Sequence, residues 1–314
     1  MTEDAMTSDG AGPAHHHESF RAGYVAIIGD PNVGKSTLLN ALIGQKISIV
    51  TDKPQTTRHK ILGIFSRGAY QIIFLDTPGL LKPKYLLQEM MMHFAESAIR
   101  DADIILFMID ATDPHMGREI EHQIAFSALQ KLDKPVYLVI NKVDLLRKEN
   151  VLPIIAFYSE QYPFKEIFPI SALNAFGTRE LLDTVVGELP EHPPYYPLDV
   201  VSEQTERFFV GEIIREKIFE IFREEIPYST TVDIIEFKED EGRKDLISAE
   251  IYVERESQKG ILIGKQGSAL KEVGERSRKD IEVFLGRPVF LQLFVKVREK
   301  WREKEAWLKR LGYR

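Results

Sequence analysis

A glycine-rich segment near the start of the chain carries the pattern G-x-x-x-x-G-K-S. Its members are Gly29, Asp30, Pro31, Asn32, Val33, Gly34, Lys35 and Ser36, and Thr37 follows them. Backbone N–H groups of such a loop converge on an anion, and the positive end of the following helix lies behind them. Lys35 can reach the β- and γ-phosphates of a nucleotide, while the Ser36 hydroxyl can bind Mg²⁺. The segment therefore predicts a site for a nucleoside triphosphate and magnesium.

A second motif, which begins with an acidic residue, follows an apolar run at residues 71–75. Its members are Asp76, Thr77, Pro78 and Gly79. A carboxylate at the carboxyl end of a strand suits a position from which it orients the ligands of Mg²⁺, and the Gly79 N–H can sense a γ-phosphate. An ordinary D-x-P-G turn is the alternative interpretation. The place of the motif at a predicted strand end favours the metal role.

The polar stretch at residues 51–60 contains two adjacent threonines, Thr56 and Thr57. Long polar loops in compact domains are usually functional or disordered. In nucleotide switches such a loop supplies a threonine that closes over Mg²⁺ and the γ-phosphate. Thr57 is the first choice and Thr56 the second, because spacing alone cannot separate them.

A third motif indicates which base is bound. Asn141, Lys142, Val143 and Asp144 follow the apolar run at residues 135–140. The Asp144 carboxylate can accept the N1–H and the N2–H₂ of guanine, whereas adenine offers neither donor and would leave the charge unpaired. Asn141 can brace the loop and contact N7, and the stem of Lys142 can lie on the purine. Further along, Ser171, Ala172 and Leu173 can offer a backbone N–H to guanine O6.

These motifs must be positioned by an open α/β sheet, where ligands bind at the carboxyl ends of the strands. Apolar and β-branched runs predict strands at residues 24–28, 61–65, 71–75, 103–110, 135–140 and 167–170, and helices at 37–42, about 117–132 and 181–189. The predicted fold class is thus an α/β P-loop domain with a mostly parallel, doubly wound sheet. Four prolines within residues 190–197 predict an extended connector.

Length and composition limit the remaining possibilities. A chain of 314 residues with 44% hydrophobic residues predicts about two soluble domains. No apolar run approaches the roughly 18 residues of a membrane span. The absence of cysteine excludes disulfides and thiol catalysis and fits a reducing cytosol. Residues 1–20 carry no Lys or Arg and predict a disordered tail, so the expected domains are 21–189 and 201–314, joined by 190–200.

The sequence of the second domain predicts helices and strands in the order α-β-β-α-α-β, with a glycine loop between two of the helices. The expected elements are a helix at 204–224, strands at 231–239 and 246–255, an apolar piece at 260–263, a helix at 268–285, a strand at 289–297 and a tail helix at 298–311. Residues 258–314 carry 15 Lys and Arg against 7 Asp and Glu. This excess indicates a polyanionic partner, although a solvated face of mixed charge would also explain it.

The ordered motifs resemble the translation-factor class of P-loop GTPases and, within it, the Era/MnmE/EngA branch. The resemblance implies GTP/GDP and Mg²⁺ as ligands, Ser36, Thr57 and Asp76 as the metal set, and Lys35, Asn32, Thr57 and Gly79 as catalytic residues. In potassium-dependent members the asparagine at the place of Asn32 helps hold K⁺; its other interpretation is a turn residue. Leu80 stands where Ras-like proteins have a water-orienting glutamine.

The second domain resembles a type II KH domain, α+β in class, in which a G-x-x-G loop holds about four nucleotides of single-stranded RNA. The matching residues are Gly264, Lys265, Gln266 and Gly267, with Ile261 and Ile263 as an apolar floor under the bases. The combination of one G domain with a C-terminal KH domain resembles one member type of that GTPase branch, and this resemblance implies a slow, monomeric, cytoplasmic GTPase that binds the 3′ region of 16S rRNA and acts in assembly of the 30S subunit.

Three questions stay open at this point. An RNA-binding assembly chaperone, in which nucleotide only sets conformation, is the alternative function. An ATPase would require that Asp144 does not read guanine. Peripheral contact with the inner membrane is the third, for which the tail at 298–311 is the candidate segment, although its acidic residues oppose anionic lipid.

Overall fold

The computed structural model describes residues 19–113, 127–129, 132–240 and 242–313. Its first domain contains β1 (Arg21–Gly29), α1 (Lys35–Ile43), β2 (Ile61–Arg67), β3 (Tyr70–Asp76), α2 (Leu86–Asp101), β4 (Ile104–Asp110), β5 (Val136–Asn141), α4 (Val151–Gln161), β6 (Ile167–Pro169) and α5 (Thr178–Glu188). Within these residues the sheet has the order β2-β3-β1-β4-β5-β6, and β2 alone runs antiparallel to its neighbour. The predicted mostly parallel α/β sheet is confirmed.

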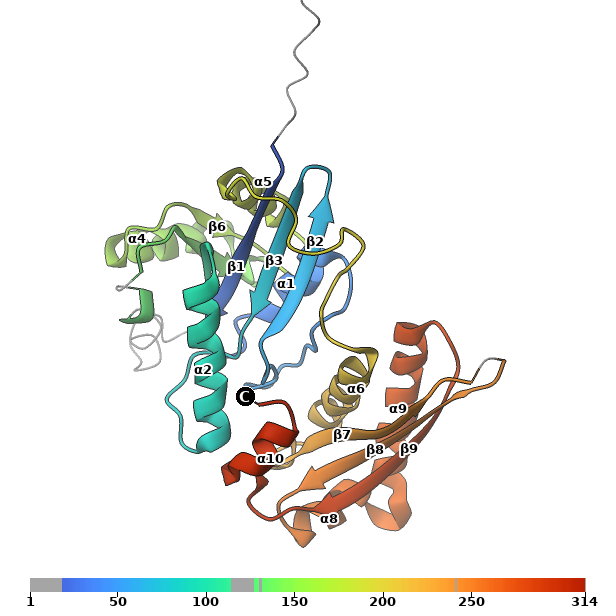
Figure 1. Cartoon of the computed structure of the whole chain (residues 1–314). Coiled ribbons are helices and arrows are strands. Elements are labelled where there is room, and N and C mark those ends of the chain that lie inside the picture. Colours follow the sequence, from blue (N-terminus) through green and yellow to red (C-terminus); the bar gives the residue numbers. More distant parts are fainter. Residues whose placement is uncertain (1–18, 114–126, 130–131, 241, 314) are drawn as a thin grey trace, which may run out of the picture.

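Alternating side chains of the central strands enter two separate cores. Ala26 and Ile28 of β1 pack under α2 and α4, whereas Val25 and Ile27 pack under α1 and α5. A parallel sheet covered on both faces requires such continuous apolar strands. The loops after β1, β3, β4 and β5 therefore emerge together at one edge, where α1 begins (Figure 1).

The second domain contains α6 (Glu206–Ile221), α7 (Ile226–Ser229), β7 (Thr231–Lys238), β8 (Asp245–Val253), α8 (Glu256–Ile263), α9 (Ser268–Leu285) and β9 (Val289–Val297). Its sheet has the order β7-β8-β9, with β7 antiparallel and β9 parallel to β8. One face of this sheet packs on α6, α8 and α9 around a third apolar core. This arrangement matches the predicted KH-like order.

Several predicted boundaries were wrong. Helix α6 ends at Ile221, before the expected 224, and the short helix α7 was missed. Residues 260–263 are the last turn of α8. The tail is two pieces, a 3₁₀ turn (Trp301–Glu303) and α10 (Glu305–Arg310), because Lys304 between them is extended. The helix expected at 117–132 falls mostly outside the described residues, as does the tail at 1–20 except for its last two residues.

The tail packs against the first domain. Trp301, Leu308 and Tyr313 are buried in the core under α2, and the Trp301 indole donates to the Ser229 carbonyl at 2.9 Å. The C-terminus consequently lies between the two domains (Figure 1). No helix in the described part of the chain is both long and apolar enough to cross a membrane.

His59 lies partly buried at this junction. Its ring stacks on Tyr313 at a centroid distance of 4.2 Å and meets the edge of Phe208. Burial lowers the pKa of His59 to about 4, against the opposing charge of Glu212 and with help from Arg215 and Arg58. The ring is therefore neutral in the folded chain.

We expect this histidine to make stability depend on pH. An unfolded histidine titrates near 6.5, so below that pH the unfolded chain binds a proton that the folded chain does not. The contribution of His59 to the free energy of unfolding should be constant above pH 6.5 and fall by about 3 kcal/mol towards pH 4. Chemical denaturation of wild type and His59→Phe across pH 4.5–7.5 checks this, because the phenylalanine keeps the stacking and removes the proton. Equal slopes for the two proteins would contradict the prediction.

Candidate nucleotide site and RNA-binding groove

The loop between β1 and α1 curls around its own lysine. The Lys35 ammonium donates to the carbonyls of Gly29 and Asp30 at 3.2 and 2.8 Å and is buried. Gly34 has a φ of +101°, and a Cβ there would lie 2.3 Å from Nδ2 of Asn141. Only glycine is suited to such a position, which requires both positive φ and close approach.

The charge of Lys35 is only partly compensated. Burial lowers its pKa to about 8, and the nearby Asp76 and Asp30 carboxylates oppose this change. A phosphate placed in the loop would favour the protonated ammonium. The buried lysine and the convergent loop thus fit an anionic ligand.

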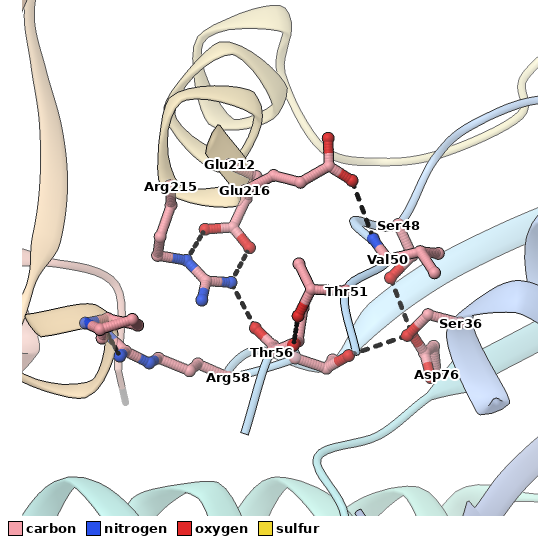
Figure 2. Close-up of polar contacts among 12 residues, drawn as sticks. Ser36, Ser48, Val50, Thr51, Thr56, Arg58, Asp76, Glu212, Arg215 and Glu216 are labelled. Atoms are coloured by element: carbon pink, nitrogen blue, oxygen red, sulfur yellow. Dashed lines mark hydrogen bonds and ion pairs between the residues drawn. The ribbon is translucent and has the colours of Figure 1, made fainter. Parts of the chain in front are cut away.

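Oxygen atoms from four segments meet behind the lysine. The Ser36 hydroxyl donates to Oδ2 of Asp76 at 2.7 Å and lies 2.8 Å from the Thr57 hydroxyl. Ser48 donates to the same Asp76 oxygen at 2.8 Å, as Figure 2 shows. Burial raises the pKa of Asp76, and its bonds from Ser36, the charge of Lys35 and the bond from Ser48 oppose the rise.

This oxygen cluster fits Mg²⁺. Oδ1 of Asp76 is buried and accepts no hydrogen bond from the described residues. Hydroxyl and carboxylate oxygens are the ligands that this hard cation prefers. The predicted metal set of Ser36, Thr57 and Asp76 therefore has the ligand chemistry that suits Mg²⁺. Ser48 was missed, and nothing in its sequence context could have indicated it.

The two candidate threonines differ in what they contact. The Thr56 hydroxyl bonds to the Thr51 hydroxyl at 2.6 Å and to the Lys53 carbonyl at 2.7 Å. The Thr57 hydroxyl instead faces Ser36. The geometry thus favours Thr57 of the two alternatives.

The segment after β3 rests directly on the phosphate loop. The Thr77 hydroxyl donates to the Ile27 carbonyl at 2.9 Å, and the Leu80 N–H donates to the Gly29 carbonyl at 3.1 Å. A Cβ on Gly79 would lie 2.6 Å from the Pro31 nitrogen. Leu80 itself is buried in the apolar core, so its side chain cannot orient water.

Asn32 bridges the phosphate loop and the segment opposite. It has a φ of +65°, and its amide donates to the Asp52 carbonyl at 2.9 Å. Asparagine is among the few residues that tolerate this conformation. The positive φ suits a turn residue, and the amide bond holds the facing loop against the phosphate loop.

These groups line one cavity of about 530 Å³. Its lining brings together Asn32, Lys35, Ser36, Thr57, Gly79 and Lys142. It also includes residues that were not predicted, among them Val50, Thr51 and Asp110. A volume of this size is typical of ligand sites.

Asn141 bonds to two other loops on the side of the site where the base is expected. Its Nδ2 donates to the Val33 carbonyl at 2.7 Å, and its Oδ1 accepts from the Ala172 N–H at 2.9 Å. Lys142 has a φ of +66° and its ammonium pairs with Asp110 at the end of β4. Three separate loops are thereby fixed around the place expected for the base.

The remaining base-reading residues lie in exposed loops. Asp144 is exposed in the 3₁₀ turn Val143–Leu145, and Leu173 is 80% exposed. The Ser171 N–H already bonds to the Phe176 carbonyl at 3.0 Å, and the Ala172 N–H bonds to Asn141. Of the three residues expected to offer an N–H to guanine O6, Ser171 and Ala172 thus already use theirs within the protein, which favours Leu173 for this role.

The G-K-Q-G loop forms a tight 3₁₀ turn (Lys265–Gly267) between α8 and α9. Gly264 has a φ of +73°, and a Cβ there would lie 2.9 Å from the Ala269 nitrogen. Lys265 and Gln266 are exposed. The apolar pair lies on α8, where Ile261 is half exposed and Ile263 partly buried.

A groove of about 490 Å³ runs from this loop between α9 and the edge strand β9. Its lining has three basic residues, Lys244, Lys271 and Arg278, against one acidic residue, Glu275, and its apolar residues are Leu270, Val289, Phe290, Leu291 and Leu293. Sequence reasoning missed this wall. Gly274 in the middle of α9 faces Leu293 of this wall, but a Cβ there would lie at an ordinary contact distance of 3.5 Å, so the glycine does not identify the groove.

Two family models match the chain. A model described as a 50S ribosome-binding GTPase matches residues 24–142, and a model described as a KH domain matches residues 225–302. The first range contains the phosphate loop and the oxygen cluster. The second contains the G-x-x-G loop and the groove.

Curated relatives match over nearly the whole length. GTPase Era of Geotalea daltonii is 47% identical over 296 residues, which are 94% of this chain and 99% of that relative. GTPase Era of Geobacter metallireducens is 49% identical over 295 residues, which are 94% of this chain and 98% of that relative. This identity and coverage reach across both domains.

Solved structures of Era are similar throughout as well. One is an Aquifex aeolicus variant bound to GDP and AlF₄⁻, with a TM-score of 0.89. Another is Era in complex with MgGDPNP and nucleotides 1506–1542 of 16S ribosomal RNA, with a TM-score of 0.90. Each is 44% identical and covers 94% of this chain and 99% of that structure's chain. The chain therefore belongs to the Era family of GTPases.

Proposed function

We propose that this GTPase binds the 3′ region of 16S rRNA and acts as a nucleotide-dependent switch in assembly of the 30S subunit. The similar Era structure that holds nucleotides 1506–1542 of that RNA supports the proposal. The basic and apolar groove between α9 and β9 is the surface of this chain that suits a single strand. Residues 21–189 would bind nucleotide, 190–200 connect, and 201–314 bind RNA.

The reaction is transfer of the γ-phosphoryl group from GTP to water, which yields GDP and phosphate. Lys35 and the N–H groups of the phosphate loop stabilise charge on the β- and γ-phosphates, and Gly79 contacts the γ-phosphate. Ser36 and Thr57 would hold Mg²⁺, with Asp76 orienting Ser36; the ion supplies charge neutralisation of the phosphates. Asn32 would hold K⁺ where that ion takes part.

The oxygen cluster of Ser36, Thr57 and Asp76 is the observation that supports GTP hydrolysis at this site. Whether hydrolysis serves as a switch is tested by single-turnover measurements with and without K⁺ and with an oligonucleotide from the 3′ end of 16S rRNA. Stimulation by the RNA supports a switch. Hydrolysis that responds to neither addition would favour the assembly chaperone in which turnover is incidental.

The proposed location is the cytosol, and the proposed state is a monomer. The tail offers little apolar surface to lipid, because Trp301 and Leu308 are buried against the first domain. Peripheral contact with the inner membrane would have to use other residues. Flotation of the purified protein with anionic vesicles measures it.

Reversing the charge of the G-x-x-G loop should weaken RNA binding. In the double variant Lys265→Asp, Gln266→Asp, two carboxylates face the RNA phosphates in place of an ammonium and an amide. We expect the affinity for the 16S oligonucleotide to fall about 10- to 100-fold, as for loss of a charged hydrogen bond. Titration by fluorescence anisotropy measures this, and GDP affinity should not change. The matched control is Lys300→Asp, outside the loop and groove; an equal loss there would show only a general effect of charge.

A further inference from the structure

Residues 46–58, called the switch segment below, bond to the second domain at several points from Lys46 to Arg58. Five of its residues bond to α6 or to the segment after it, which includes α7: Lys46 and Val50 to Glu216, Lys53 to the carbonyls of Phe219 and Phe222, Thr56 to Arg215, and Arg58 to the carbonyls of Pro227, Tyr228 and Thr230. This is the segment that carries Thr57. The switch segment therefore both supplies Thr57 to the nucleotide site and bonds to the RNA-binding domain (Figure 2).

Arg215 makes the contact nearest to Thr57. Its Nη2 donates to the Thr56 carbonyl at 2.5 Å, and that carbonyl belongs to the peptide that joins Thr56 to Thr57. The side chain is 2% exposed. A hydrogen bond at this peptide restricts the backbone dihedrals that set the direction of the Thr57 hydroxyl.

The guanidinium is itself fixed in place. Glu212, one turn earlier on α6, accepts from Nε at 2.8 Å and from Nη2. The centroid of the Phe219 ring lies 5.3 Å from the guanidinium carbon. A planar fork held in this way loses little conformational entropy when it forms the third bond to Thr56.

Thr57 in turn contacts the oxygen cluster of Ser36 and Asp76. The Thr57 hydroxyl lies 2.8 Å from that of Ser36, which in turn donates to Asp76. A displacement of the Thr56 carbonyl would thus move one of the oxygens around the proposed Mg²⁺ position. Small misplacements of such groups have large effects on rate.

We propose that Arg215, from the RNA-binding domain, is a positioning residue for GTP hydrolysis that orients Thr57 through the Thr56 carbonyl. The inference rests on the proposed role of Thr57. GDP has no γ-phosphate for Thr57 to close over, so Arg215 should matter for the triphosphate and not for the diphosphate. A residue that only docks the two domains would show no such difference.

Arg215→Lys is the informative substitution. Lysine keeps a positive charge beside Glu212, but its ammonium ends one bond short of the position of Nη2, the atom that bonds to both Glu212 and the Thr56 carbonyl. We expect the affinity for a non-hydrolysable GTP analogue with Mg²⁺ to fall about tenfold, the GDP affinity to stay within twofold, and the single-turnover rate to fall about tenfold at saturating GTP. Isothermal titration calorimetry and quench-flow measure these. Hydrogen exchange at the amides of residues 56–58 should also become faster.

Lys53→Ala is the matched control, because it removes bonds between the same segment and α6 without touching the Thr56 peptide. It should leave the ratio of analogue affinity to GDP affinity unchanged. An equal loss in both variants would overturn the proposal in favour of general domain docking. An unchanged ratio in Arg215→Lys would overturn it directly.

Thr57→Ala separates this inference from the proposed function beneath it. If Thr57→Ala weakens analogue binding while Arg215→Lys does not, only the role of Arg215 is wrong. If Thr57→Ala has no effect either, the assignment of Thr57 fails, and the inference about Arg215 fails with it.

Discussion

Replacement of Lys35 by alanine is expected to lower the single-turnover rate of GTP hydrolysis by about 10²- to 10³-fold. The ammonium is buried within the phosphate loop, where it donates to Gly29 and Asp30 and lies close to Asp76. Charge that develops on the phosphates would lose its nearest cation in a site of low dielectric. Quench-flow at saturating GTP measures the rate. Lys60→Ala, which removes a lysine from the same domain outside the cavity, should retain it.

A pH signature identifies the same lysine without any turnover. The pKa of Lys35 is lowered to about 8 by burial, against the charges of Asp76 and Asp30, and bound phosphate favours its protonated form. Above pH 8 the free protein must take up a proton to bind GDP, so affinity should fall by up to about tenfold per pH unit. Titration calorimetry at pH 7–9 should show this fall in wild type. In Lys35→Ala the affinity should be weaker and should lack this component, and an equal fall would contradict the assignment.

Asp144→Asn is expected to lower GDP affinity by about 10²- to 10³-fold and to raise affinity for xanthosine diphosphate. Two hydrogen bonds from guanine to a carboxylate are each worth about 1.5–3 kcal/mol. Asparagine presents one donor and one acceptor, and xanthine carries a carbonyl where guanine carries its amino group. The exchanged pair is therefore complementary again. Dissociation constants for the two diphosphates, measured with both proteins, complete the cycle.

The gain in xanthosine diphosphate binding is also the folding control, because a misfolded variant would bind neither ligand. ADP should bind weakly to both proteins. If Asp144→Asn kept full GDP affinity, the guanine assignment would be wrong and the specificity for GTP would need another origin.

Contiguous motifs could be predicted from sequence because their function depends on local structure. The phosphate loop at 29–36 is one strand end, one turn and one helix start, so its glycines and Lys35 identify it without distant partners. The motifs ending at Gly79 and Asp144 each follow an apolar strand. A parallel sheet brings such strand ends to one edge, so their convergence followed from the strand pattern.

In the second domain some features could be predicted from sequence and others could not. The order of elements and the loop at 264–267 could be recognised, since helix and strand periods differ and glycines mark turns. Groove residues on β9, such as Phe290, could not, because an exposed aromatic residue on an edge strand resembles any other surface residue. The tail was predicted as one helix because its charge pattern is helical. Burial of Trp301 against the other domain outweighed that local preference.

What the sequence determined by itself is the class of ligand and the residue types that meet it: a phosphate loop, a metal-binding hydroxyl and a base-reading carboxylate. The tertiary structure alone decided which threonine faces Ser36, that Ser48 joins Asp76, and that Arg215 reaches the Thr56 carbonyl. The physical reason is separation along the chain. Hydrogen bonds between residues far apart in sequence depend on how two domains pack, and no local pattern encodes that distance.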